Sequence, residues 1–193
     1  TMRTAGNMAG YADLNIRKAI DAGTMLGPAI HVTAPYLEGP GLPIPQVKAL
    51  RDAADARKMV NYWADEGATS FKTYMHITRA ELGAVTQEAH KRGLKVTGHL
   101  CSVTFREAAS LGIEDLERGF VVASDFVPDK KPDECPAGNA VQRSIATLDV
   151  NGAGARDLIA ELVCRRVAIT STLTIFETFV GSQPSAPAKA LDA

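Results

Sequence analysis

Several features are scarce or missing in this sequence, and each absence excludes a class of protein. The three cysteines, Cys101, Cys135 and Cys164, lie far apart without a CxxC motif, which argues against a disulfide framework or a cysteine zinc site. No run of about 18 apolar residues predicts a membrane-spanning helix, and no charged-then-apolar N-terminus indicates a secretory signal. We therefore expect reduced thiols in a cytoplasmic protein.

The charges are balanced, which bears on the kind of partner. Lys and Arg number 21 and Asp and Glu number 22, so the net charge is −1 at pH 7, and no basic cluster occurs. This argues against nucleic acid as the main partner. Hydrophobic residues make up 46% of the 193 residues, as in ordinary soluble globular proteins. We therefore expect neither nucleic acid nor a membrane as a partner.

Common cofactor and catalytic motifs are also missing. No GxGxxG follows the first predicted strand, and no P-loop, GxSxG or HExxH occurs. No HxH pair occurs anywhere in the chain. Phosphate and dinucleotide binding therefore have no motif support.

What the sequence does contain is a regular alternation of short β-branched segments and amphipathic segments. Strands are predicted at 1–4, 28–33, 68–73, 94–99, 113–117 and 167–173, and helices at 11–22, 52–66, 78–92, 104–111 and 154–165. A long loop with about one helical turn is predicted over 120–150. Such alternation predicts a parallel sheet with crossover helices, either doubly wound or a (β/α)8 barrel. Both folds place their chemistry at the carboxyl ends of the strands.

Three consecutive predicted strands end in residues that can bind metals or anions. They are Lys72, His99 and the pair Glu117 and Arg118. Adjacent parallel strands lie about 4.8 Å apart, so these side chains can converge. Taken singly, such residues are more often a solvated lysine or a hydrogen-bonded histidine, and it is their joint placement at strand ends that favours a site.

The segment that carries these residues resembles a known family. It reads FKTY at 71–74, AHKRGLKVTGH at 89–99 and AASLGIEDLERG at 108–119, and the phrase HVTAPYLEG at 31–39 fits as well. This pattern is similar to the metal-dependent amidohydrolase superfamily, closest to its imidazolonepropionase-like and prolidase-like branch. The resemblance covers about residues 1–180.

The resemblance implies a (β/α)8 barrel with one or two divalent metal ions, usually zinc. The family's ligands are an HxH pair after the first strand, a carboxylated lysine after the fourth, histidines after the fifth and sixth, and an aspartate after the eighth. Lys72 matches the lysine and His99 the fifth-strand histidine, so the chain would hold strands two to seven. The implied activity is cleavage of an amide, peptide or cyclic amide C–N bond by a metal-activated water, and the implied partner is a small-molecule amide or peptide substrate.

Two departures from the family open an alternative. Arg118 stands where the family has its sixth-strand histidine, and a protonated guanidinium cannot bind a metal. The HxH pair and the aspartate are absent. Arg118 could bind a substrate carboxylate and Tyr74 could orient substrate. The alternative is a non-catalytic barrel relative that binds a small metabolite, and a third interpretation is a doubly wound sheet.

The predicted domain covers residues 1–181, followed by a disordered tail over 182–193 that is rich in Pro, Ala and Ser. An incomplete barrel would leave two strand edges unpaired. We therefore expect copies of the chain to associate or aggregate through these edges.

Weaker site candidates are Glu38, His31, His76, His90 and Cys101.

Overall fold

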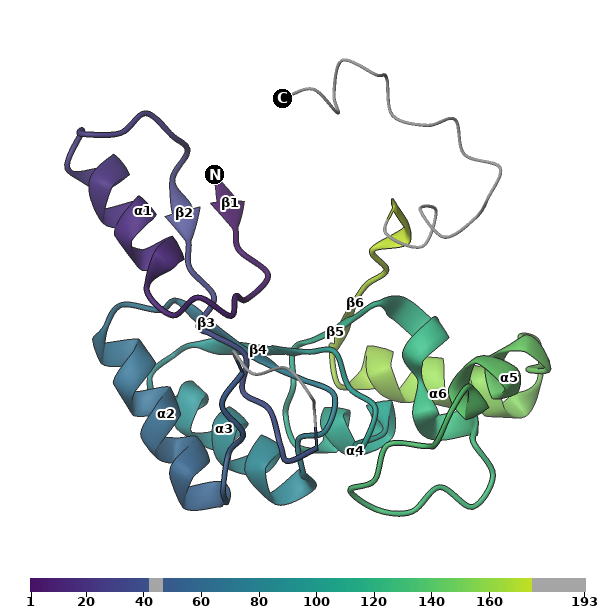
Figure 1. Ribbon diagram of the computed structural model, residues 1–193. Helices are drawn as coiled ribbons and strands as arrows, with labels where there is room; N and C mark the ends of the chain where they lie inside the picture. Colours follow the sequence, from purple (N-terminus) through teal and green to yellow (C-terminus); the bar gives the residue numbers. More distant parts are fainter. Residues whose placement is uncertain (42–46, 175–193) are drawn as a thin grey trace.

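A computed structural model describes residues 1–41 and 47–174, in which six parallel strands alternate with helices (Figure 1). The strands are β1 (Met2–Arg3), β2 (Ile30–His31), β3 (Ser70–Thr73), β4 (Lys95–Gly98), β5 (Asp115–Glu117) and β6 (Ala168–Thr170). The α-helices are α1 (Ala12–Asp21), α2 (Ala53–Asp65), α3 (Arg79–Lys91), α4 (Phe105–Ser110), α5 (Ala140–Ala146) and α6 (Ala153–Cys164). The predicted alternation is confirmed. The segment predicted as a long loop holds two 3-10 helices, η1 (Gly119–Val122) and η2 (Ser124–Phe126), as well as α5.

The strands follow one another across the sheet in chain order. β1 pairs with β2, and β3, β4, β5 and β6 pair in succession, always in parallel. A parallel bridge between Thr33 and Ser70 connects the two sets. A doubly wound sheet reverses its strand order at a switch point. The described strands show no such reversal, so the doubly wound interpretation does not fit.

The sheet is strongly curved. The guanidinium of Arg3 on β1 lies 3.6 Å from a carboxylate oxygen of Glu117 and 3.8 Å from one of Asp115, both on β5. In a flat sheet, strands four places apart are separated by about 19 Å, at about 4.8 Å for each pair. That separation exceeds the combined reach of an arginine and a glutamate side chain. The face that carries these three residues must therefore be concave.

The helices cover the opposite, convex face of β3 to β6, as Figure 1 shows for α2, α3, α4 and α6. Side chains alternate along a strand, so every second residue points at the helices. Phe71, Val96 and Leu116 are fully buried in this core. Burying each such side chain contributes about 1.5–3 kcal/mol. The alternate positions carry polar residues on the concave face.

Side-chain caps fix where three of the helices begin. A capping box begins α3: Thr78 accepts from the backbone N–H of Glu81, and the Glu81 carboxylate accepts in return. A second capping box joins Thr104 and Glu107 at the start of α4. Asp52 caps α2 by accepting from the N–H of Asp55 at 2.8 Å.

The expectation of three reduced thiols is wrong. Cys101 forms a disulfide with Cys135, with the two Cα atoms 4.9 Å apart, and Cys164 is free and exposed. The sequence does not reveal this pair because Cys101 and Cys135 lie 34 positions apart. They meet because the long segment after β5 folds back over the end of β4. Disulfides are rare in the cytosol. The ground for expecting a cytoplasmic protein is thus removed, and the compartment stays a prediction.

Further interactions hold the same segment in place. The Asp133 carboxylate accepts from the Arg79 guanidinium and from the Arg79 backbone N–H at the start of α3. The Lys130 ammonium donates to the backbone oxygen of Ser102. The loop after β5 is therefore fastened beside the carboxyl end of β4.

Some predictions concern parts of the chain or of the fold that the structure leaves open. The predicted tail over 182–193 and the end of the predicted domain, from 175, lie outside the described residues. Closure into an eight-stranded barrel and the view of the chain as strands two to seven stay predictions. In the ranges 1–41 and 47–174, no helix has the length and apolar character needed to cross a membrane.

Candidate functional site

The concave face carries a buried ion pair at its centre. The Lys72 ammonium on β3 donates to the Glu117 carboxylate on β5, and these residues are only 2% and 3% exposed. Thr97 on β4, between them, donates its hydroxyl to the other carboxylate oxygen of Glu117 at 2.9 Å. A buried ion pair is stable only when its remaining polar atoms are also satisfied. Glu117 meets this condition, with Arg3 as a further cation.

A second carboxylate extends this cluster toward β6. Asp115 lies two residues before Glu117 and so points to the same face. It accepts from the Thr170 hydroxyl at 3.0 Å and lies near Arg3. Burial raises the pKa of Asp115 above its usual range, and the hydrogen bond from Thr170 acts in the opposite direction. The cluster thus spans β1, β3, β4, β5 and β6.

His99 differs from this cluster because its ring nitrogen is not satisfied. It directly follows β4, and its backbone N–H donates to the Thr73 carbonyl at 3.1 Å. Its Nδ1 is buried, with no hydrogen-bond partner in the described part of the chain. Burial lowers the pKa of His99 to about 4, and the nearby positive charge of Arg118 adds to the effect. The imidazole is therefore neutral at pH 7, the form that accepts a hydrogen bond or binds a metal.

Arg118 has an unusual backbone conformation, and its guanidinium pairs with no acid in the part of the chain that the structure describes. Its φ is 75°, in the left-handed region, where a non-glycine residue is disfavoured. The side chain is half-buried, and no carboxylate within residues 1–41 and 47–174 forms an ion pair with it. Strained residues of this kind are found at functional sites more often than elsewhere. Arg118 supplies a guanidinium that is free to meet an anion.

Two stacked tyrosines complete the group. The rings of Tyr36 and Tyr74 are parallel with centroids 4.6 Å apart, and Tyr74 meets the His99 ring edge-on at 5.0 Å. Burial raises the pKa of both phenols, and the Arg118 charge acts in the opposite direction on each. The Lys72 ammonium lies 5.3 Å from the centroid of Tyr36. The tyrosines therefore link the buried ion pair to His99 and Arg118.

The structure thus places all four predicted site residues, Lys72, Tyr74, His99 and Arg118, at the carboxyl end of the sheet. The weaker candidates have other surroundings. The Glu38 carboxylate is buried and accepts from the backbone N–H groups of Gly39 at 2.8 Å and His76 at 2.6 Å, so it holds two loops together. His90 pairs with Glu114 at the surface, and His31 is exposed on β2.

Several members of the cluster were not predicted from the sequence: Arg3, Thr97, Asp115, Thr170 and Tyr36. One signal was available for Asp115, because its spacing of two from Glu117 puts both on one face of a strand. The others depend on the curvature of the sheet, which brings distant strands together. No local pattern in the sequence reports that curvature.

The residues present fit a divalent metal only in part. The buried, unpartnered Nδ1 of His99 suits a ligand, since neutral imidazole binds zinc well. Lys72 suits one only as a carbamate, and its ammonium is held by Glu117 here. Within the described residues, no group of three or more His, Cys, Asp or Glu side chains is arranged to hold a metal ion.

Solved structures supply the comparison with known proteins. None of the protein-family models matches the chain, and no curated protein matches it. A Xaa-Pro dipeptidase with methionine bound in its active site is 17% identical with a TM-score of 0.55, covering 88% of this chain and 53% of its own. A Bifidobacterium longum protein assigned as a prolidase is 20% identical with a TM-score of 0.56, covering 88% and 51%. The bottromycin amidohydrolase AH is 25% identical with a TM-score of 0.54, covering 66% and 27%.

These neighbours carry the names of hydrolases, and their fold is the one that this chain shares. The chain spans about half the length of the first two, 53% and 51%, and 27% of the third. Their names include a prolidase and an amidohydrolase, the kinds of enzyme that the sequence resembles. At 17% and 20% identity the first two show the fold alone.

Proposed function

We propose that the chain is part of a metal-dependent hydrolase that cleaves amide or peptide C–N bonds in a (β/α)8 barrel. The strand order, the curved sheet and the hydrolase neighbours support this. The observation that carries the proposal is the buried, neutral His99 with its unpartnered nitrogen, one strand away from the buried Lys72.

Two residues of this chain would hold the metal. His99 would bind through its imidazole, and Lys72 through a carbamate formed with carbon dioxide, whose two oxygens can bridge two ions. A bound divalent ion, zinc in the first instance, polarises the scissile carbonyl and lowers the pKa of a bound water. Carboxylation removes the positive charge of Lys72, so its pairing with Glu117 must then be lost. Thr97 continues to donate to the Glu117 carboxylate.

Arg118 and Tyr74 would bind the substrate. The Arg118 guanidinium can donate two parallel hydrogen bonds to a carboxylate, which gives both affinity and orientation. Tyr74 packs against His99 and offers a phenol at the same edge. A dipeptide or an N-acyl amino acid carries both the C–N bond and the carboxylate that this arrangement requires. We therefore propose such small amides as the substrate class.

A second candidate function has an observation in its favour. Lys72 is engaged as an ammonium with Glu117, and Arg118 stands where the resembled family has a metal-binding histidine. Both features suit a non-catalytic relative that binds a small anionic metabolite without a metal. In that case Arg118 would still bind the ligand, and Lys72 would be structural.

Metal content separates the two candidates. The 193-residue chain and the complete reading frame that contains it are reconstituted with zinc and 13C-bicarbonate. We expect near-stoichiometric zinc by mass spectrometry, a carbamate signal by 13C NMR, and hydrolysis of dipeptides or N-acyl amino acids. His99→Asn should lose the zinc and Lys72→Met the carbamate signal. His90→Asn, at an exposed histidine, is the matched control and should change neither.

The opposite result is equally clear. If both proteins stay free of zinc and carbamate after reconstitution, the hydrolase proposal is overturned. Binding of an anionic metabolite that depends on Arg118 would then support the non-catalytic candidate.

A further inference from the structure

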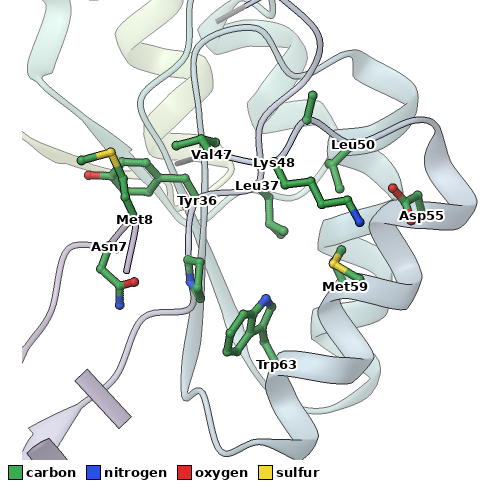
Figure 2. Close-up of a pocket in the computed structure, with 12 residues that line it drawn as sticks. Asn7, Met8, Tyr36, Leu37, Val47, Lys48, Leu50, Asp55, Met59 and Trp63 are labelled. Carbon is green, nitrogen blue, oxygen red and sulfur yellow. The ribbon is translucent and has the colours of Figure 1, made fainter. Parts of the chain in front are cut away.

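A cavity of about 170 Å³ lies beside the candidate site and has no role in the function proposed so far. Loop residues after β1 and β2 form part of its wall, and α2 forms another part. Figure 2 shows Trp63 and Met59 approaching the cavity from α2, with Lys48 extending toward Asp55 at one side. It lies at the same end of the sheet as His99, because these loops follow the carboxyl ends of their strands.

The cavity wall is mainly apolar. Leu37 and Leu50 are buried, and Met59 and Trp63 pack partly against the core. The wall also contains one carboxylate, Asp55, which is already satisfied. It accepts from the Arg51 guanidinium at 2.9 Å and from the Arg51 backbone N–H.

This charge pattern selects the occupant. The Lys48 side chain extends toward the same carboxylate (Figure 2), but the ion pair of Asp55 is with Arg51. The rest of the wall is mainly apolar. A cationic group would lose hydration without gaining a free carboxylate there, and the apolar wall compensates little for the lost hydration of a polar group. The cavity therefore suits an uncharged, apolar group.

Its size suits one side chain. An engineered apolar cavity of about 150 Å³ stays dry and binds benzene. A cavity of about 170 Å³ can therefore take a branched aliphatic side chain or a phenyl ring. It is too small for a larger ligand to enter whole, so the rest of that ligand must lie outside.

Tyr36 connects the cavity to the site. It belongs to the cavity wall, and its ring stacks on Tyr74 at 4.6 Å, which in turn meets His99 at 5.0 Å. Gly6 makes room for this arrangement: a Cβ there would lie 2.5 Å from the Tyr36 ring, and its φ of 83° also favours glycine. A molecule with one apolar group in the cavity would hold its polar part near Tyr74 and His99.

We propose that this cavity is a specificity subsite that takes the apolar side chain of the substrate. Its preferred ligands are N-acyl or peptidyl derivatives of leucine-sized and phenylalanine-sized amino acids. That this ligand is a substrate rests on the hydrolase function proposed above. The cavity itself requires only that such a molecule binds.

The chain contains its own reporter for the test. Trp63 is the one tryptophan of the sequence and lines the cavity, so its fluorescence responds to an occupant. The chain is titrated with N-acetyl-L-leucine and with N-acetylglycine, which share the same carboxylate. We expect the leucine derivative to bind at least about tenfold more tightly, the ratio expected from burying most of a leucine side chain. Equal affinities would overturn the assignment.

Two variants and a control locate the effect. Val47→Phe places a ring in the cavity and should remove the preference for leucine. Met59→Ala enlarges the cavity and should shift the preference toward N-acetyl-L-phenylalanine. Val150→Phe makes the same change as the first variant at a position that is 69% exposed, and should leave the preference unchanged. A preference that both cavity variants leave intact would contradict the proposal.

The titration does not depend on catalysis, so the two proposals can fail separately. Zinc-dependent hydrolysis with no preference among side chains would overturn the subsite and leave the hydrolase function in place. A leucine preference in a protein that binds no zinc would support the cavity and overturn the hydrolase function.

Discussion

Glu117 and Arg118 are neighbours in the chain, but their charges have very different surroundings. The Glu117 carboxylate is buried and satisfied by Lys72, Thr97 and Arg3. The Arg118 guanidinium is half-buried on a strained backbone, and neither it nor the Nδ1 of nearby His99 has a partner among residues 1–41 and 47–174. The first arrangement stabilises the curved sheet, and the second keeps polar groups available for a ligand. Two adjacent charged residues thus have opposite surroundings, one with its partners inside the fold and the other without an acid beside it in the described part of the chain.

The largest expected effect comes from removing the buried Glu117 carboxylate, whose partners are all present in the fold. Glu117→Ala leaves the Lys72 ammonium buried without its counter-charge, which typically costs about 3–5 kcal/mol. We expect a loss of that size in the free energy of unfolding, measured by urea denaturation. The double variant Lys72→Met/Glu117→Leu should recover most of it, because neither charge is then buried.

Asp65→Ala is the matched control for that experiment. Asp65 pairs with Arg92 at 2.7 Å, but its side chain is 67% exposed. An exposed pair contributes about 0–1 kcal/mol. If Glu117→Ala costs no more than Asp65→Ala, the Lys72–Glu117 cluster is not the structural centre described here.

The disulfide is expected to have the next largest effect. It closes a 34-residue loop beside His99, and the chain-entropy estimate for such a loop is about 3–4 kcal/mol. Cys135→Ser should therefore lower the midpoint of thermal unfolding and make it insensitive to dithiothreitol. Cys164→Ser, at the free exposed cysteine, should leave both unchanged. If the unfolding midpoint of the parent chain does not change with reductant, the Cys101–Cys135 disulfide is contradicted.

The pH dependence of stability tests the surroundings of His99. The pKa of His99 is lowered to about 4 in the folded chain, against about 6.5 in the unfolded chain. The unfolded state therefore takes up a proton first as pH falls, and stability decreases from about pH 6.5 down to about pH 4. The decrease is at most about 1.4 kcal/mol for each pH unit.

Other groups titrate in the same range, so His99→Gln provides the reference. As pH falls from 7 to 4, the free energy of unfolding of the parent chain should decrease relative to that of this variant. The histidine NMR signal that is lost in the variant should titrate near pH 4. A signal that titrates near pH 6.5 would show that His99 is open to solvent.

The smallest expected effect concerns the strained turn. Arg118→Gly relieves a left-handed backbone, so we expect it to stabilise the fold by about 1 kcal/mol. Because the Arg118 charge helps to lower the pKa of His99, the variant should also raise that pKa. Arg166→Gly is the control: Arg166 is exposed with a φ of 59°, so it should give a similar stabilisation without affecting His99. A destabilised Arg118→Gly would mean that the guanidinium has a structural partner.

Much of the fold could be predicted from local patterns. All six strands occur where β-branched segments were found, and the capping box at Thr78 begins α3. Strand alternation and caps depend on a few neighbouring residues, so the sequence reports them directly. Lys72 and His99 became site candidates for the same reason, since each lies at the carboxyl end of a predicted strand, and the structure places them at the carboxyl ends of β3 and β4.

The rest depends on contacts between distant segments. The pairing of Lys72 with Glu117 joins strands two places apart, and Arg3 reaches the same carboxylate only because the sheet curves. The Cys101–Cys135 disulfide needs the loop after β5 to fold back, which its proline content does not indicate. The cavity at Trp63 similarly arises where two loops meet a helix.

The turn at Arg118 has a consequence for evolutionary history. Histidine is among the non-glycine residues that tolerate the left-handed region best. The backbone at this position therefore poses no obstacle to the histidine that the resembled family carries there, and a single nucleotide change converts certain arginine codons to histidine codons. Where Arg118 is encoded by CGU or CGC, one nucleotide change gives histidine, and this backbone would accept the new side chain without reorganisation of the fold.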